Sequence, residues 1–296
     1  MTGAGHRARA RRRIAGPAAA LLLCVLTAVP AEAAPQRIAS LSLCADQLLL
    51  RMVDRDRIVS LTRFSAMPDI SGQADDVGDI PLNRGRAEEV LPRRPDLVIA
   101  GTFTAPATKA MLRRLRIRLL EIPIAADFDA IRSNVLRVGE AVGATDAADA
   151  MVRDMTRRLA AARPKGGKRP LVLLYRLGGY SQGRDTLMDA MLREAGFRNY
   201  AARHLPGVAR LSLEAILRDP PDGVILGSNQ GDRSSKAAEI LSHPGFRRLL
   251  AQRPFMSLPD RLWICGLPDS VQAVEQLAAF RRQFEEPPRR AAEAGP

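Results

Sequence analysis

One segment of this 296-residue chain occurs twice, at an offset of 126 residues. Residues 87–101 read AEEVLPRRPDLVIAG and residues 213–227 read LEAILRDPPDGVILG, so seven of the fifteen positions are identical. Each copy has the pattern of a short helix, a Pro-Asp turn, a buried strand and a final glycine. Two copies half a chain apart predict two similar lobes, because a solenoid needs three or more closely spaced repeats. We therefore expect a ligand to bind in a cleft between lobes.

The first 33 residues have the pattern of an export signal. Five arginines within residues 7–13 precede an apolar run over residues 14–29, and Ala31-Glu32-Ala33 fits a cleavage site. Gly16 and Pro17 interrupt the apolar run, which argues against a permanent membrane helix. The pattern predicts a periplasmic protein and leaves the Sec and twin-arginine routes open.

The chain is basic, with 45 Lys and Arg residues against 32 Asp and Glu residues. Cleavage after Ala33 would remove five arginines and Glu32, which leaves a net charge of +9. The arginines are scattered and aromatic residues are few, so we expect no nucleic-acid partner. A basic cleft that attracts an anionic ligand is one interpretation; an Arg-rich composition without functional meaning is the other.

Strands alternate with helices in the first half of the mature chain, which predicts an α/β lobe with a largely parallel sheet. Residues 66–86 are rich in Pro, Gly, Asp and Asn and are expected to form loops. The first repeat copy lies among the other expected elements, which are the strands Arg37–Ser42, Arg57–Leu61 and Arg118–Ile122 and the helices Ala45–Val53 and Ala105–Leu115.

A helical section follows this lobe. Apolar residues from Phe128 to Val142 recur at spacings of three and four. Gly143 is a suitable C-cap, and Thr145 a suitable N-cap for a second helix that runs to about Ala162. Such a helix is roughly 27 Å long, which is enough to connect two lobes. A rigid connection of this kind predicts only a small closure movement on ligand binding.

The second lobe is predicted to open with the strand Pro170–Tyr175 and the turn Gly178-Gly179-Tyr180. The remaining expected elements are the helix Thr186–Ala195, the second repeat copy, short helices over residues 236–251, a strand over Arg261–Ile264 and a final helix over Ser270–Phe284. The predicted organisation is a signal peptide (1–33), an N-terminal lobe (34–143), a connecting helix (144–164), a C-terminal lobe (165–285) and a disordered tail (286–296).

The order RIASLSLCADQLLL, RIVSL and the repeated E-x-x-L-x-x-x-P-D-x-V-I resembles periplasmic binding proteins of the helix-hinged class. That class serves ABC importers of ferric siderophores and cobalamin. The resemblance extends from about Arg37 to Phe284. It implies two Rossmann-like α/β lobes joined by one long helix, a ligand between them, and an inner-membrane ABC permease as partner. Ser42-Leu43-Cys44 departs from the commonest pattern, Ser-Pro-Ser, and leaves the exact ligand open.

The resemblance also implies a docking role for one glutamate in each repeat copy, Glu88 and Glu214. In that family, a glutamate on each lobe contacts basic residues of the transporter. Two carboxylates far apart on one rigid body define an orientation, and charge pairing steers docking. Both residues also lie near predicted helix N-termini, where a carboxylate stabilises the helix dipole. These two roles are compatible.

Ligands of α/β lobes gather in the loops that follow the carboxyl ends of the strands. Five of the twelve aromatic residues fall in these loops, and aromatic faces suit a large, partly apolar chelate. Arginine supplies bidentate hydrogen bonds to carboxylates. Local packing of each loop is the alternative role. The candidate ligand-binding residues are Cys44, Arg63, Phe64, Asn83, Arg84, Phe103, Tyr175, Arg176, Gly179, Tyr180, Trp263 and Cys265.

Cys44 and Cys265 fall at predicted strand ends, one in each lobe. An oxidising compartment permits a disulfide between them. Direct metal coordination is less favoured, because two cysteines without a nearby His or acid make a poor metal site. Plain packing or ligand contact is the possibility that the sequence favours. The sequence predicts neither a resident metal nor a cofactor.

No catalytic pattern is found in the chain: it lacks a Walker loop, H-E-x-x-H, G-x-S-x-G and a dinucleotide fingerprint. We therefore predict a monomeric binding protein, not an enzyme. Its predicted ligand is a small-molecule metal chelate, with a ferric siderophore first, a corrinoid (cobalamin or cobinamide) second, and haem less favoured. A metallocluster or chelatase-type enzyme on a similar two-lobed fold is one alternative, and a periplasmic scavenger or sensor without an importer is another.

Overall fold

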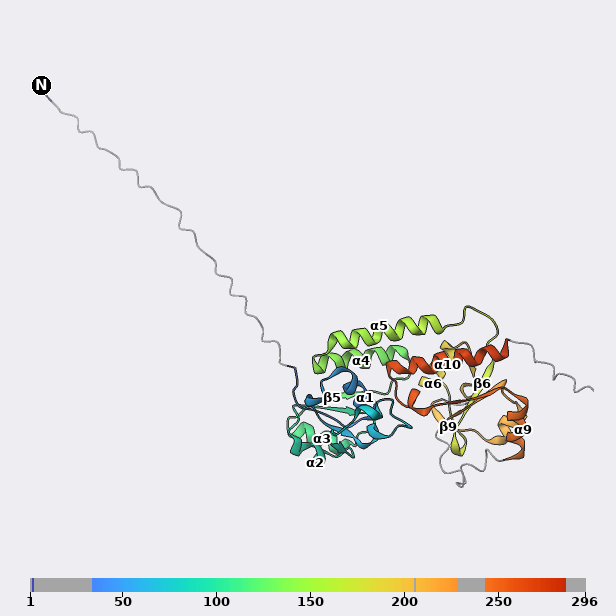
Figure 1. Ribbon diagram of the computed structural model, residues 1–296, viewed down its shortest axis with the longest axis horizontal. Helices are drawn as coiled ribbons and strands as arrows, with labels where there is room; N and C mark the ends of the chain where they lie inside the picture. The colour runs from blue at the N-terminus through green and yellow to red at the C-terminus, as the bar shows by residue number, and fades with distance from the viewer. Residues whose placement is uncertain (1, 3–33, 205, 228–242, 286–296) are drawn as a thin grey trace, which may run out of the picture. The chain divides into compact units, whose positions relative to one another are not determined.

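The computed structural model describes residues 34–204, 206–227 and 243–285, together with Thr2 (Figure 1). The predicted tail over residues 286–296 lies outside the described residues, as does the predicted signal peptide apart from Thr2. All elements named below belong to one unit of the chain, separate from residues 1–33. Within the described ranges, no helix combines the length and apolar character that a membrane span requires.

The first sheet has five parallel strands in the order β3-β2-β1-β4-β5. The two-residue strand β3 lies in the segment predicted as loops, and it is too short to show an alternating pattern. The strands are β1 (Ile38–Ser40), β2 (Ile58–Thr62), β3 (Leu82–Asn83), β4 (Leu97–Gly101) and β5 (Arg118–Ile122), and the helices are α1 (Leu43–Met52), α2 (Ala87–Val90) and α3 (Pro106–Arg114).

The second sheet has four parallel strands in the order β11-β10-β6-β8. The strands β7 and β9 form a separate antiparallel pair. The strands are β6 (Leu171–Tyr175), β7 (Tyr180–Gln182), β8 (Arg198–Asn199), β9 (Val208–Arg210), β10 (Gly223–Gly227) and β11 (Phe255–Leu258). The helices are α6 (Leu187–Glu194), α7 (Leu213–Arg218), α9 (Pro244–Gln252) and α10 (Val271–Arg281). The predicted α/β class is confirmed.

The strand predicted over Arg261–Ile264 is wrong. The strand of this region is β11, and Asp260–Leu262 forms a single 3-10 turn (η7). Leu262 and Trp263 are buried in the core as part of a loop, so their apolar character does not indicate a strand. Of the short helices predicted over residues 236–251, α9 is described and residues 236–242 lie outside the described residues.

Two helices connect the sheets in sequence, α4 (Phe128–Val142) and α5 (Thr145–Ala162). Gly143 ends α4 in the left-handed conformation at φ 72°, as predicted. Thr145 is not the N-cap: it is the first helical residue, and Ala144 occupies the capping position. The helix α5 packs against α4 and α10 (Figure 1).

The hydrophobic core is continuous between the two sheets. On β4, Ile99 faces this shared core, whereas Val98 faces a second cluster with residues of α2 and α3. On β10, Ile225 faces the shared core and Val224 faces a third cluster with residues of α7 and α9. Successive side chains of a strand point to opposite faces. The repeated sequence therefore marks equivalent strands of two similar layered units.

The repeated aspartates have the same structural role in both copies. The Asp96 carboxylate accepts hydrogen bonds from the backbone N–H groups of Gln36 (2.7 Å) and Arg37 (3.0 Å), just before β1. The Asp222 carboxylate accepts one from the backbone N–H of Leu171 (2.7 Å), at the start of β6. Each turn aspartate thus fixes the beginning of the neighbouring strand.

Candidate ligand-binding site

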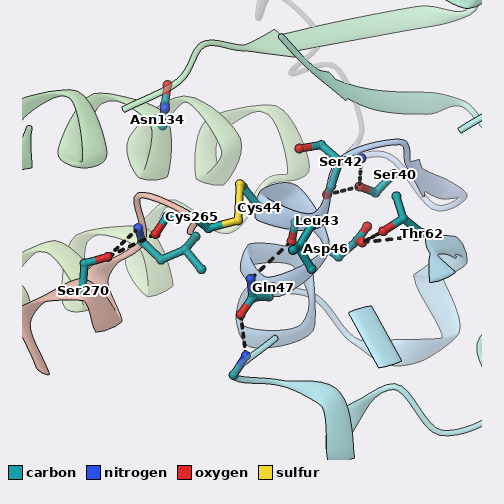
Figure 2. The surroundings of a disulfide bond; sticks show 12 residues. Ser40, Ser42, Leu43, Cys44, Asp46, Gln47, Thr62, Asn134, Cys265 and Ser270 are labelled. Carbon is teal, nitrogen blue, oxygen red and sulfur yellow. Dashed lines mark hydrogen bonds between the residues drawn. A yellow bond between two sulfur atoms is a disulfide. The ribbon is translucent and has the colours of Figure 1, made fainter. Parts of the chain in front are cut away.

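Because the strands of each main sheet are parallel, their carboxyl ends lie at one edge of that sheet. A disulfide joins these two edges: Cys44 belongs to the first turn of α1, directly after β1, and Cys265 follows β11 and η7 (Figure 2). Their Cα atoms are 5.3 Å apart. Among the alternatives left open by the sequence, the structure shows the disulfide rather than free thiols.

Serine hydroxyl groups hold both cysteine-bearing turns. Ser40 Oγ donates to the carbonyl of Ser42 (3.1 Å) and accepts from the Ser42 backbone N–H (3.2 Å), immediately before Cys44. Ser270 Oγ donates to the carbonyl of Cys265 (3.1 Å) and accepts from the backbone N–H of Leu267 (3.3 Å) (Figure 2). The loops on either side of the disulfide are therefore internally fixed.

A small cavity of about 120 Å³ lies between segments of the two lobes. One wall comes from Gln47, Gly72 and Gln73, and the other comes from residues 261–272. Arg51 forms an ion pair with Asp269 (2.8 Å) across the same junction. The junction between the lobes is thus polar around the disulfide.

Exposed aromatic rings follow strand ends in both lobes. Phe103, after β4, is 90% exposed, and Phe64, after β2, is 39% exposed. Tyr180, after β6, is 41% exposed. The Arg63 guanidinium lies 5.0 Å from the centre of the Phe64 ring. These rings offer flat apolar surface with positive charge beside it, which suits a large, partly apolar and partly polar ligand.

Arg210 was missed by the sequence interpretation. It lies directly opposite Tyr180 in the β7–β9 pair, and its guanidinium is 4.8 Å from the centre of the Tyr180 ring. The available signal was the short segment Val208–Arg210, but three residues are too few for a recognisable strand pattern. Arg210 belongs to the same candidate surface as Tyr180.

Trp263 is buried, with only 3% of its surface exposed. The Arg176 guanidinium lies 4.9 Å from the centre of its ring and pairs with the Asp260 carboxylate at 3.1 Å. The indole Nε1 has no hydrogen-bond partner among the described residues. Arg176, which is one-third exposed, is therefore the accessible group over Trp263.

Three other candidates, Asn83, Tyr175 and Gly179, have structural roles and are buried. Asn83 is 1% exposed, and its Nδ2 donates to the carbonyls of Ser40 and Leu61 and to Ser60 Oγ at 2.8–2.9 Å. Tyr175 is buried with its ring centre 4.8 Å from that of Phe246.

Burial raises the pKa of the Tyr175 hydroxyl to about 12. Gly179 adopts φ 78° in the turn after β6, a conformation that favours glycine. Arg84, in contrast, is exposed. The exposed candidates are thus Arg63, Phe64, Arg84, Phe103 and Tyr180.

Asp46 is a second polar residue that the sequence interpretation missed. It is fully buried in α1, and its carboxylate accepts hydrogen bonds from the backbone N–H of Thr62 (3.2 Å) and from the Thr62 hydroxyl (Figure 2). Desolvation raises the pKa of Asp46 to about 7, although hydrogen bonds from Ser40 and Thr62 oppose this shift. Asp46 connects α1 to the end of β2, and Arg63 and Phe64 follow directly after that end.

The two glutamates with a predicted docking role occupy equivalent places. Glu88 is the second residue of α2 and Glu214 the second residue of α7, and both are exposed. The neighbouring Glu89 differs, because its carboxylate accepts from the backbone N–H groups of Arg84 (2.8 Å) and Arg86 (3.3 Å). Hydrogen bonds from its own backbone and from Ser212 lower the pKa of Glu214. Glu214 is therefore charged at neutral pH.

A larger cavity, of about 640 Å³, lies among α4, α5, α6 and α10. None of the candidate ligand-binding residues lines it. Its arginines already have partners: Arg163 pairs with Glu194 (2.9 Å), and Arg281 donates to the carbonyl of Gly166 (2.8 Å). This cavity is consequently not the candidate site.

Comparisons with known proteins agree with this architecture. A family model of periplasmic binding proteins matches residues 38–253. A cobalamin-binding protein of Halobacterium salinarum is 29% identical over 224 residues, which cover 74% of this chain and 60% of that protein. The chain thus spans about three fifths of the length of this relative.

Two further matches cover more of their own length. An ABC transporter substrate-binding lipoprotein of Bacillus subtilis, YvrC, is 26% identical over 258 residues, which cover 82% of this chain and 79% of that protein. The apo structure of the periplasmic haem-binding protein RhuT of Roseiflexus sp. RS-1 superposes with a TM-score of 0.71 at 23% identity, over 85% of this chain and 99% of that one. The solved structure supports the fold alone.

Proposed function

Because this chain belongs to the periplasmic binding protein family, we propose that it captures a metal chelate and delivers it to an ABC permease. Proteins of this family bind and transport substrates, and the chain is a binding protein rather than an enzyme. The observation that carries the ligand proposal is the set of exposed aromatic rings at the strand ends of both lobes, two of them beside an arginine. A broad chelate presents matching flat and polar surfaces.

A corrinoid is the first candidate ligand. Arg176 is paired with Asp260 and Trp263 is buried, so both side chains are engaged within the protein and are less available to an anionic siderophore. The cobalamin-binding relative supports the same class. The exposed rings of Phe103 and Tyr180 would contact the apolar parts of the corrin, and nearby arginines would bind its polar periphery.

A ferric siderophore is the second candidate. Arg63, Arg84 and Arg210 are exposed, and no carboxylate lies within ion-pair distance of them in the described part of the chain. Three such cations would attract an anionic ferric complex.

The ligand proposal is tested by calorimetric titration of the protein that begins at residue 34. The panel contains cyanocobalamin, cobinamide, ferric hydroxamates, a ferric catecholate and haem. We expect one corrinoid to bind at a 1:1 ratio with micromolar or tighter affinity. The double variant Phe103→Ala/Tyr180→Ala should weaken binding by at least about tenfold, which corresponds to roughly 1.4 kcal/mol.

Phe255→Ala is the matched control, because this half-exposed ring starts β11 at the opposite edge of the sheet. Its affinity should equal that of the wild-type protein. Binding of a siderophore alone would establish the second candidate instead. Absence of binding by every compound in the panel would remove the metal-chelate proposal.

The docking proposal is tested separately by the double variant Glu88→Gln/Glu214→Gln. We expect ligand uptake by cells to fall at least about tenfold while ligand affinity is unchanged, because the lost charges face the permease and not the ligand. Glu89→Gln is the control, since Glu89 is bound to backbone amides of its own lobe. Normal uptake by the double variant would contradict docking and leave a scavenger or sensor role.

A further inference from the structure

The Cys44–Cys265 disulfide is a second covalent connection between the lobes. We propose that it holds the two strand-end edges at a fixed separation, so that the ligand surface is formed before the ligand arrives. Cys44 and Cys265 are then positioning residues for ligand binding. The expected effect on ligand binding rests on the proposed function, whereas the expected effect on the flexibility of the junction rests on the structure alone.

The disulfide closes a loop of the chain that contains every strand of both sheets except β1. The main chain passes from the first sheet to the second through α4 and α5, whereas the disulfide joins residues 221 positions apart, at the strand ends. Two lobes that are joined only through α4 and α5 can move relative to each other about these helices. With two connections at different places, bending that separates Cys44 from Cys265 requires one connection to break.

The disulfide is anchored in rigid segments at both ends. The serine hydrogen bonds described above fix both turns. Gly266, next to Cys265, is packed so closely against the first lobe that an added Cβ would lie 2.5 Å from the Cβ of Ala125. Trp263 and Leu267 belong to the core that the two sheets share. A covalent restraint at Cys265 is therefore transmitted to the segment that carries Trp263 and, through it, to Arg176.

The ion pair between Arg51 and Asp269 at this junction is a weaker restraint than the disulfide. The side chains of Arg51 and Asp269 are 30% and 25% exposed, and such ion pairs are screened by solvent. The nearby cavity also leaves part of the junction unpacked. Loss of the disulfide should therefore loosen the junction although the ion pair remains. A less preorganised surface binds its ligand more weakly, because ordering then accompanies binding.

The test starts by reducing the native protein with a phosphine, which supplies two electrons and becomes a phosphine oxide, while the disulfide becomes two thiols. One half of the sample is capped with iodoacetamide. The other half is treated with diiodomethane, so that both thiolates displace iodide and one methylene group joins the sulfur atoms. This second product restores a covalent connection without a disulfide.

We expect the capped protein to show at least about tenfold faster amide hydrogen exchange over residues 262–267, and the bridged protein to recover the slow exchange of the oxidised protein. With cobinamide as probe, dissociation should be about tenfold faster after capping and normal after bridging. Cys44→Ala/Cys265→Val serves as a second variant if capping prevents folding. Far-UV circular dichroism verifies that each sample is folded.

Arg51→Ala is the matched control: it removes the ion pair and keeps the disulfide, so exchange and dissociation should stay within about twofold of wild type. Slow exchange in both the capped protein and the double variant would overturn the proposal. Fast exchange that bridging fails to restore would overturn it as well. Because exchange requires no ligand, these outcomes are decided even if no compound of the panel binds.

Discussion

At the scale of single residues, the buried carboxyl group of Asp46 makes stability depend on pH. Its pKa is 3.8 in its ordinary state and about 7 in the folded protein, so between these values the folded state binds more protons than the unfolded state. The contribution of Asp46 to the free energy of unfolding is fully present below about pH 4 and is lost as the pH rises to 7. Asp46→Asn should therefore be neutral near pH 4 and stabilising above pH 7, by at most roughly 4 kcal/mol.

Urea unfolding of both proteins at pH 4, 5.5 and 7.5 measures this difference. Asp75→Asn, an exposed carboxylate in the loop region of the same lobe, is the control and should show no such trend. A difference between Asp46→Asn and wild type that does not grow with pH would show that Asp46 is charged without penalty in the folded state.

Single residues also show where the sequence stops being informative. Phe103 and Trp263 both lie near strand ends, yet one ring is almost fully exposed and the other is buried under Arg176. The sequence could place both at the carboxyl edge, because this follows from parallel strands. It could not distinguish them, since burial of a loop residue depends on contacts with distant segments. Asn83, which is held by three buried hydrogen bonds, is a further case.

At the scale of elements, the repeated Pro-Asp turn is predicted to contribute unequally to the two sheets. Asp96 accepts two backbone hydrogen bonds before β1, and Asp222 accepts one at the start of β6. Hydrogen bonds to charged groups contribute roughly 1.5–3 kcal/mol each, and exposure of the Asp96 bonds reduces this value. We expect Asp96→Ala to cost about 2 kcal/mol and Asp222→Ala about 1.5 kcal/mol.

Hydrogen exchange should locate the two effects, with Asp96→Ala increasing exchange in β1 and β4 and Asp222→Ala increasing it in β6 and β10. Asp56→Ala, an exposed aspartate outside the repeats, is the reference substitution. Equal effects on both sheets from either substitution would contradict a local role for the turn.

Elements with long periodic patterns were predicted accurately from the sequence. The helices α4 and α5 end within one residue of their predicted bounds, because several residues contribute to each pattern. Short pairs such as β7 and β9 were missed, since each strand has three residues and its pairing is non-local. The strand β11 was placed too late because a buried apolar loop has the same composition as a buried strand.

At the scale of the whole molecule, the sequence predicts two lobes and a helical connection, but it could not establish that a disulfide also joins them. The pairing of Cys44 with Cys265 depends on the arrangement of both sheets around the shared core, and no local pattern contains that information. The repeat established that each lobe is built alike, because its identical residues occupy the same positions in β4 and β10.

A covalent connection over 221 residues also predicts a large effect on equilibrium stability. In the chain-entropy view, a loop of this length restricts the unfolded chain by about 5 kcal/mol, which is an upper limit for the stabilisation. Cys44→Ser/Cys265→Ser should lower the free energy of unfolding towards this amount. The urea m-value should rise, because the uncrosslinked unfolded chain exposes more surface to denaturant.

Equilibrium urea unfolding of the oxidised protein and the double variant measures both quantities. The wild-type protein in a reducing buffer is the matched control and should behave like the variant, since both lack the crosslink. If both lose stability without a change in m-value, the stabilisation arises from contacts in the folded junction rather than from the unfolded chain. In that case the disulfide would act on the native arrangement of Cys44, Cys265 and their fixed turns, and the entropic account would be wrong.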